Sequence, residues 1–129
     1  MMEERTQAAI EGFFSRYRDA FKHGAQAIAA FYSEPCVTAR AGKVRVNATL
    51  AETRALFETV DQQYRSRGMT HGEIERMEIR SMGVNAVMAT IRWKYKDASG
   101  RTLWETTFSY NVYRRNDDWK ILVQTMHDE

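Results

Sequence analysis

The sequence contains little cysteine and little proline, and it lacks any long apolar run. Cys36 is the single cysteine among 129 residues. A disulfide within the chain and a cysteine metal cluster are therefore excluded, as is typical of a reducing compartment. No apolar stretch approaches the roughly 20 residues that cross a bilayer, and the polar residues 1–5 are unlike a signal peptide. We therefore expect a cytoplasmic protein with no membrane partner.

An excess of charge of one sign is lacking as well. The chain has 19 basic and 17 acidic side chains, for a net charge of +2. Nucleic-acid-binding domains usually carry a strongly basic stripe, so this near balance predicts no nucleic-acid partner. The sequence has no His-x-x-x-His pair and no Asp ladder, and the glycines at 68 and 72 have no lysine of a phosphate loop between them. We expect neither a metal nor a cofactor.

Apolar residues are present in sufficient number for one core. Hydrophobic residues make up 43% of the chain and aromatic residues 12%, and a chain of this length fits one domain. Because no repeat or linker interrupts the pattern, we predict a single domain over residues 1–129.

The first half of the chain has helical periodicity. An apolar stripe at three- and four-residue steps predicts a helix over 6–23 that ends before Gly24, formed by Ile10, Phe13, Phe14, Tyr17 and Phe21. A short helix is predicted over 25–32 and ends before Pro35. Thr49 and Glu52 form a capping box that begins a third helix, whose buried face is predicted to contain Thr53, Leu56, Phe57, Val60 and Tyr64.

The second half alternates with a period of two. Short strands over 36–39 and 43–47 precede the third helix, and longer strands follow over 71–81, 87–95, 101–115 and 119–125. Ile74 and Met77 are three residues apart and would face opposite sides of a regular strand, which predicts a bulge between them. Helices followed by hairpin-linked strands indicate an α+β fold. We predict a curved antiparallel sheet wrapped around the long N-terminal helix, with two further helices, which forms a cone.

This order of elements resembles the nuclear transport factor 2-like superfamily, which includes ketosteroid isomerases, scytalone dehydratase and SnoaL-like polyketide cyclases and has a cystatin-like α+β cone. The resemblance rests on the opening helix at 10–17, the short helix ending at 30–34, the helix at 50–66 and the closing segment 113–121. It covers nearly the whole chain and implies a conical pocket, together with a dimer through the outer face of the sheet. It does not specify a function, because this fold carries many.

One departure from the superfamily bears on the chemistry. Ketosteroid isomerases carry a general-base aspartate after the strand that follows the short helix, whereas the matching stretch 36–40 holds no carboxylate. Abstraction of a proton beside a carbonyl needs such a base, so we do not expect that reaction. Tyr17 falls near the superfamily's tyrosine in the first helix, and Arg40 replaces the acidic position.

Aromatic and basic residues supply the candidate ligand-binding site, and no catalytic residue is assigned. Flat side chains at the open end of a cone bind apolar or ring-shaped ligands. The predicted ligand-binding residues are Tyr17, Tyr32, Thr38, Arg40, Trp93 and Tyr110. Alternatively, Trp104 and Tyr110 lie on the outer face of the sheet and form an interface. Arg40, Arg45 and Arg92 either bring positive charge to the pocket mouth, which favours a carboxylate or phosphate, or are solvated strand residues, the interpretation we favour for Arg45.

The three histidines and Cys36 have simpler interpretations. His71 is either a base at the pocket rim or a surface residue, and the polar surroundings favour the surface. His127 and Asp128 are neighbours on a strand and point to opposite faces, so they do not form a catalytic pair. His23 complements a helix dipole, and Cys36 is predicted to be a small buried apolar residue.

Two functional hypotheses follow. In the first, the protein binds a small, largely apolar or aromatic molecule in a conical pocket, either as a binder or as an isomerase, cyclase or dehydratase that works with neutral polar groups and water. In the second, it is a non-catalytic binding or dimerisation module that uses the outer sheet face. Both are compatible with a homodimer through the sheet.

Overall fold

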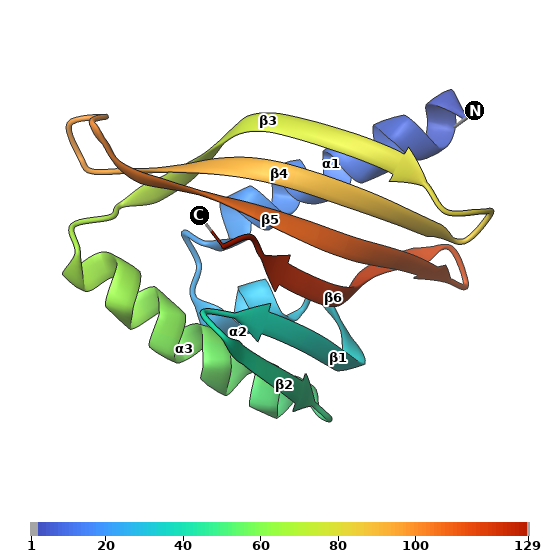
Figure 1. The fold of residues 1–129 in the computed structure, drawn as a ribbon, viewed down its shortest axis with the longest axis horizontal. Coiled ribbons are helices and arrows are strands. Elements are labelled where there is room, and N and C mark those ends of the chain that lie inside the picture. The colour runs from blue at the N-terminus through green and yellow to red at the C-terminus, as the bar shows by residue number, and fades with distance from the viewer. Residues whose placement is uncertain (1–2, 129) are drawn as a thin grey trace.

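A computed structural model describes residues 3–128. Its elements, in chain order, are the helices α1 (Glu4–Ala20) and α2 (Ala25–Ala29), the strands β1 (Tyr32–Arg40) and β2 (Lys43–Asn47), the helix α3 (Leu50–Ser66), and the strands β3 (His71–Ser81), β4 (Ala86–Lys96), β5 (Thr102–Arg115) and β6 (Asp118–Met126). Figure 1 shows the strands in front and the helices behind them. The predicted α+β class is confirmed.

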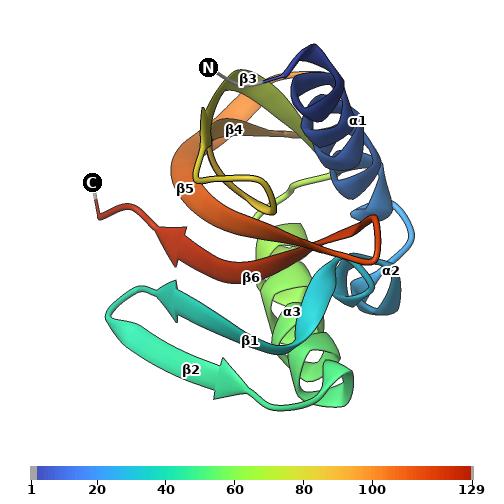
Figure 2. The ribbon, with the colours of Figure 1, turned by 90° about the vertical axis from the view of Figure 1, so that its right-hand side faces the viewer.

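The six strands form one curved sheet in the order β2-β1-β6-β5-β4-β3. All neighbouring strands are antiparallel except β1 and β6, which run parallel. The sheet is therefore mixed, and the prediction of a purely antiparallel sheet from the C-terminal half is wrong in this respect, because the β1–β2 hairpin extends it beyond β6. Figure 2 shows the sheet curling around an interior that α1 and α3 close from one side.

Helix α1 presents the predicted apolar stripe to this interior. Ile10, Phe13, Phe14 and Tyr17 are all buried. The helix ends at Ala20, three residues before the predicted end, since the next three N–H groups bond to carbonyls only three residues back. Helix α2 is also shorter than predicted, because Tyr32 already belongs to β1 and is paired with Ile121 of β6.

Helix α3 begins at the predicted capping box. The Thr49 hydroxyl accepts a hydrogen bond from the Glu52 N–H at 3.2 Å, and the Glu52 carboxylate accepts one from the Ala48 N–H at 2.7 Å. The capping box thus supplies side-chain acceptors to two backbone N–H groups at the start of the helix. The buried face contains Thr53, Phe57, Val60 and Tyr64, as predicted, while Leu56 is half-buried.

The long strands alternate as the sequence predicts. A register shift lies between Ile74 and Arg76 in β3, where the bulge was expected. In β4 the odd-numbered residues from 87 to 95 are buried. Trp104 and Tyr110 of β5 face the interior as well, where Trp104 stacks on Tyr95 with ring centroids 4.8 Å apart. The alternative that placed Trp104 and Tyr110 on the outer face is therefore wrong.

Strand β6 departs from the predicted alternation. Val112 pairs with Ile121 and Asn111 pairs with Val123, so Leu122 is an extra residue in the ladder. This bulge reverses the side-chain direction of the residues after it. Gln124 consequently points into the interior and is buried, as Ile121 is.

Candidate functional site

A chain of polar side chains crosses the interior of the cone. The Tyr17 and Tyr32 hydroxyls lie 2.6 Å apart, and the Gln124 amide donates to the Tyr32 hydroxyl at 3.0 Å. The Arg40 guanidinium donates through Nη1 to the Gln124 carbonyl oxygen at 3.1 Å and through Nη2 to the Tyr64 hydroxyl at 3.0 Å. These five side chains come from four different elements, α1, β1, β6 and α3, so they meet only in the folded protein.

Aromatic rings surround this polar chain. The Arg40 guanidinium carbon lies 5.1 Å from the centre of the Phe108 ring, a cation–π distance. The Trp93 indole donates to the Tyr110 hydroxyl at 3.0 Å. Among the described residues, no buried side-chain nitrogen or oxygen lacks a hydrogen-bond partner. The interior is therefore a largely apolar core that contains a small polar network, and the buried polar atoms of this network all have hydrogen-bond partners.

Burial keeps the interior tyrosines neutral. Desolvation raises the pKa of Tyr17, Tyr32 and Tyr110 well above the ordinary value, because a phenolate would lose its hydration. For Arg40, desolvation acts to lower the guanidinium pKa, but the hydroxyls of Tyr64 and Tyr32 outweigh it and the pKa lies above its ordinary value. The network thus combines neutral hydroxyls with one permanent positive charge.

Two hollows meet at Arg40. On the inner side is a cavity of about 20 Å³, which has room for about one water molecule. On the outer side is a cleft of about 510 Å³ at the wide end of the cone. Arg40, Val60 and Tyr64 line both hollows, so these three residues separate the cavity from the cleft.

The cleft has an apolar wall and a basic rim. Its apolar lining comes from Leu56, Val60, Trp104 and Met126. Its charged lining is entirely positive among the described residues and consists of Arg40, Lys43, Arg45 and Arg67. The Arg67 guanidinium carbon lies 3.7 Å from the centre of the Trp104 ring. An apolar ligand with a polar or negative end would match this lining.

The structure places the six predicted site residues on the inner side of the sheet. Tyr17, Arg40, Trp93 and Tyr110 line the cavity, and Thr38 lines the cleft beside Arg40. Tyr32 completes the polar chain through its hydroxyl.

Arg45 and Arg92 have different positions. Arg45 is an exposed residue of β2, as expected of a solvated strand residue, and it also lines the cleft. Arg92 lies on the outer face of β4, where it donates to Glu105 at 3.2 Å and to Thr107 at 2.9 Å, so its placement at the pocket mouth is wrong.

Three contributors to the site do not stand out in the sequence. Gln124 escaped notice because the bulge at Leu122 reverses its direction, and a lone glutamine in an apolar strand was the only signal. Lys43 and Arg67 were not singled out, because Lys43 follows the turn between β1 and β2 and Arg67 follows the end of α3, and basic residues are common at both kinds of position. Tyr64 was predicted as core, but its hydroxyl binds Arg40.

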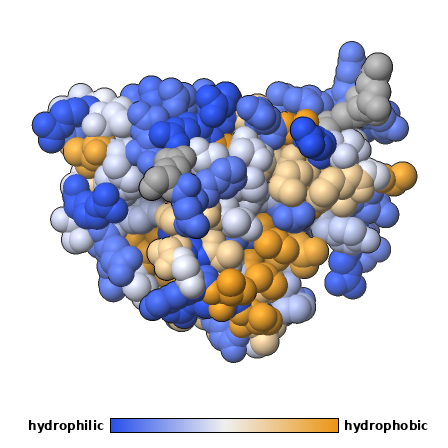
Figure 3. Space-filling view, in the orientation of Figure 1, coloured by the Kyte–Doolittle hydropathy of each residue, from blue (hydrophilic) through white to orange (hydrophobic). Residues whose placement is uncertain are grey.

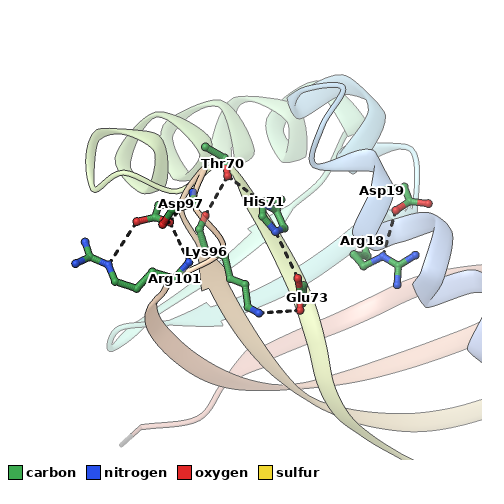
Figure 4. Close-up of polar contacts among 9 residues, drawn as sticks. Arg18, Asp19, Thr70, His71, Glu73, Lys96, Asp97 and Arg101 are labelled. Atoms are coloured by element: carbon green, nitrogen blue, oxygen red, sulfur yellow. Dashed lines mark hydrogen bonds and ion pairs between the residues drawn. The ribbon is translucent and has the colours of Figure 1, made fainter.

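His71 belongs to a surface cluster at the start of β3. Figure 4 shows that polar contacts join Thr70 to His71, His71 to Glu73, and Glu73 to Lys96. The His71 Nδ1 lies 2.9 Å from the Thr70 hydroxyl, and its Nε2 lies 3.4 Å from the Glu73 carboxylate. A hydrogen bond from Lys96 lowers the pKa of Glu73. His71 lines neither hollow, which agrees with the surface interpretation.

The other reactive side chains are engaged elsewhere. His127 is exposed and its Nε2 lies 2.8 Å from the Ser109 hydroxyl. Cys36 is buried, with its sulfur 3.3 Å from the Thr53 hydroxyl. Within residues 3–128, no three His, Cys, Asp or Glu side chains are grouped so that they could hold a metal ion. None of the described helices has the length and apolar content needed to span a membrane.

An apolar patch lies on the outer face of the sheet. Val37 is paired with Val46 and Val123, and Ala39 is paired with Val44, so all five point away from α3. Val44 and Val46 are 74% and 70% exposed. Figure 3 shows apolar surface gathered over the region that β1, β2 and β6 occupy in Figure 1. We call these five residues the valine patch. The outer surface of β4 and β5 is polar by contrast, with Thr90 bonded to Ser109.

Comparison with known proteins gives one family and many similar folds. The family described as "NTF2-like protein (DUF6841)" matches residues 3–129. No curated protein matches the sequence significantly. An NTF2-like protein of unknown function from Shewanella oneidensis MR-1 is 21% identical with a TM-score of 0.75, over 95% of this chain and 99% of that one.

Two further crystal structures resemble the fold at lower identity. A protein of unknown function with a cystatin-like fold from Nostoc punctiforme PCC 73102 is 10% identical, with a TM-score of 0.81 over 97% of this chain and 92% of that one. An NTF2-like protein of unknown function from Pseudomonas putida KT2440 is 12% identical, with a TM-score of 0.79 over 100% and 90%. At these identities the similarity establishes the cone alone.

Proposed function

The chain belongs to the NTF2-like family DUF6841, and we propose that it binds a small, largely apolar molecule at the wide end of its cone. The ligand lies in the cleft, with its apolar body on Trp104, Val60 and Leu56 and its polar end at Arg40. We further propose a cytoplasmic location, because a single buried free cysteine suits a reducing compartment.

The polar chain that starts at the cleft is the observation that carries this proposal. Ligand sites are typically concave and apolar, with a few polar groups that converge on one point and fix the ligand's orientation. The cleft of about 510 Å³ falls within the usual size range of such sites. Arg40 opens onto it and is held in place by Gln124 and Tyr64.

The lining restricts the chemistry that this site could perform. Among the described residues, neither hollow is lined by an Asp, Glu or His side chain, so proton transfer near neutral pH has no evident base there. If the protein is an enzyme, we propose that Arg40 and the Tyr64 hydroxyl stabilise negative charge that develops on a substrate oxygen, as in an oxyanion hole. Water would then carry the protons.

A thermal-shift screen with paired tryptophan variants tests the proposal. The screen contains steroids, aromatic polyketides and aromatic acids. A ligand that binds only the folded state raises the melting temperature, and we expect at least one class to do so. The shift should shrink in Trp104→Leu and persist in Trp119→Leu.

Trp119 is a matched control because Arg114 covers its ring at 5.2 Å, as Arg67 covers Trp104. A screen without any hit would contradict the proposal. If the ligand-induced shift in melting temperature fell equally in the two variants, the ligand would not bind in the cleft.

The valine patch favours a second function, namely dimerisation through the outer sheet face. Exposed apolar patches commonly mark interfaces, and C2 dimers bury the same patch from both subunits. We expect a homodimer that Val44→Glu converts to a monomer, measured by light scattering after size-exclusion chromatography. Val84→Glu is the control, since Val84 is 79% exposed in the β3–β4 connection. A monomeric wild type, or a dimer that survives Val44→Glu, would rule this interface out.

A further inference from the structure

We propose that the ligand of the cleft is an aromatic carboxylate whose carboxylate group binds the Arg40 guanidinium. This inference rests on the proposed function and adds the chemical class of the ligand. It follows from the charges around the cleft, the environment of Arg40 and the position of the rings.

Unpaired positive charge is concentrated at this cleft. None of Arg40, Lys43, Arg45 and Arg67 forms an ion pair with a carboxylate of the described residues. The two lysines near the end of β4 are paired by contrast: Lys94 lies 3.5 Å from Glu75, and Lys96 lies 3.1 Å from Glu73. What distinguishes the cleft is that four such cations line one concavity that no described Asp or Glu lines, although the chain as a whole carries a net charge of only +2.

Arg40 is the innermost of these cations and the most constrained. It is half-buried, and both of its hydrogen bonds to described residues go to neutral acceptors, Gln124 and Tyr64. A charge withdrawn from water without a counter-ion is costly, so an anion that reaches Arg40 regains favourable energy. A guanidinium carries five N–H groups, and two of them are used here, which leaves donors for a carboxylate.

A carboxylate fits this position better than a more highly charged group. The planar guanidinium presents two parallel donors to a planar carboxylate. A single guanidinium at the inner end balances one negative charge, and its neighbours there are the Phe108 ring and neutral polar groups. The exposed Lys43, Arg45 and Arg67 supply a positive field that attracts an anion toward the cleft.

The walls of the cleft indicate an aromatic body for the ligand. Tyr64 and Trp104 form an edge-to-face pair with centroids 5.2 Å apart, and both line the cleft. Tyr95 and Arg67 lie against the Trp104 ring, so a flat ligand ring would pack against the open edge of this pair and against Met126. The apolar share of the lining argues against a fully hydrophilic anion such as inorganic phosphate, since such an anion would leave these side chains facing water.

A matched pair of probes tests the charge directly. Binding of 2-naphthoate and of its neutral amide, 2-naphthamide, is measured by isothermal titration calorimetry. Because a hydrogen bond to a charged group is stronger than one between neutral groups, we expect 2-naphthoate to bind about tenfold to hundredfold more tightly than the amide. Its affinity should fall with added salt, while that of the amide should not.

Charge-neutralising variants locate the site on the protein. We expect Arg40→Gln to remove the preference for 2-naphthoate and Arg67→Gln to weaken its binding severalfold. Arg114→Gln is the matched control, because Arg114 lies over a tryptophan ring as Arg67 does but does not line the cleft, and it should leave binding unchanged. The surface variant Arg67→Gln keeps the test valid if Arg40→Gln does not fold.

Each other outcome contradicts a different part of the argument. Equal affinity for the naphthoate and the amide, with both lost in Trp104→Leu, would refute the carboxylate and retain the proposed function. Tighter binding of 2-naphthyl phosphate than of 2-naphthoate would also refute the carboxylate. If no naphthalene probe binds and the thermal-shift screen also finds no ligand, the proposed function fails and this inference fails with it.

Discussion

Replacing Gln124 with leucine tests whether the polar chain is one coupled unit. Gln124 accepts a hydrogen bond from Arg40 and donates one to Tyr32. The first involves a charged group and contributes about 1.5–3 kcal/mol, and the second contributes about 0.5–1.5 kcal/mol. A leucine of similar size regains part of this loss through apolar burial, so we expect Gln124→Leu to destabilise the fold by about 2 kcal/mol.

The coupling between Gln124 and Arg40 distinguishes this explanation from simple packing. In the background of Arg40→Met the guanidinium is gone, so the leucine at 124 no longer leaves a buried donor unsatisfied. We expect the cost of Gln124→Leu to fall to about 1 kcal/mol in that background, because removal of both partners is cheaper than removal of one.

Urea denaturation followed by tryptophan fluorescence measures these differences. With an m-value of about 1–3 kcal/mol per M, a loss of about 2 kcal/mol lowers the midpoint by about 1 M. Gln62→Leu on the exposed side of α3 is the control and should change stability by less than about 0.5 kcal/mol. An equal cost of Gln124→Leu in both backgrounds would refute the coupled chain.

Three further predictions concern the scaffold. Thr49→Ala removes the N-cap of α3 and should cost about 1 kcal/mol in urea denaturation, whereas Thr59→Ala in mid-helix should cost less; equal costs would argue against the cap. Gly24→Ala should lower the melting temperature, because the residue has a φ of 95°, and an unchanged temperature would contradict this. The Asp97 pKa is lowered by hydrogen bonds from Ser99 and the Arg101 N–H, so its stabilisation is complete above the unfolded-state pKa of about 3.9 and lost as the pH falls through the folded pKa. The stability difference from Asp97→Ala should therefore narrow below about pH 4, and a constant difference across pH 3–7 would refute the assignment.

The sequence was sufficient to predict most elements of the fold. Local sequence patterns predict helix α1, the start of α3 at its capping box, and the inward-facing residues of β4. The residues that these patterns place on the inner face are the ones buried in the structure. The parallel pairing of β1 with β6 did not follow, because it joins Val37 to Val123 across most of the chain and no local pattern records such a contact. The same holds for the mixed character of the sheet.

The site was predictable only in part, and for a physical reason. Tyr17 and Arg40 were identified by their place in a resembling fold, and both line the cavity. Gln124 was not identified, because a bulge at Leu122 depends on how the sheet curves and reverses the side chains after it. Lys43 and Arg67 reach the cleft from the β1–β2 turn and the end of α3, which only the assembled cone brings together.

The most direct test of the central claim is the response of the three indole N–H resonances to 2-naphthoate in a ¹⁵N–¹H correlation spectrum. The chain has three tryptophans, of which Trp104 lines the cleft, Trp93 lines the cavity and Trp119 lines neither hollow. We predict that Trp104 shifts progressively during the titration and that Trp119 does not move. A saturating titration that moves Trp119, or that leaves Trp104 in place, would contradict binding at the wide end of the cone.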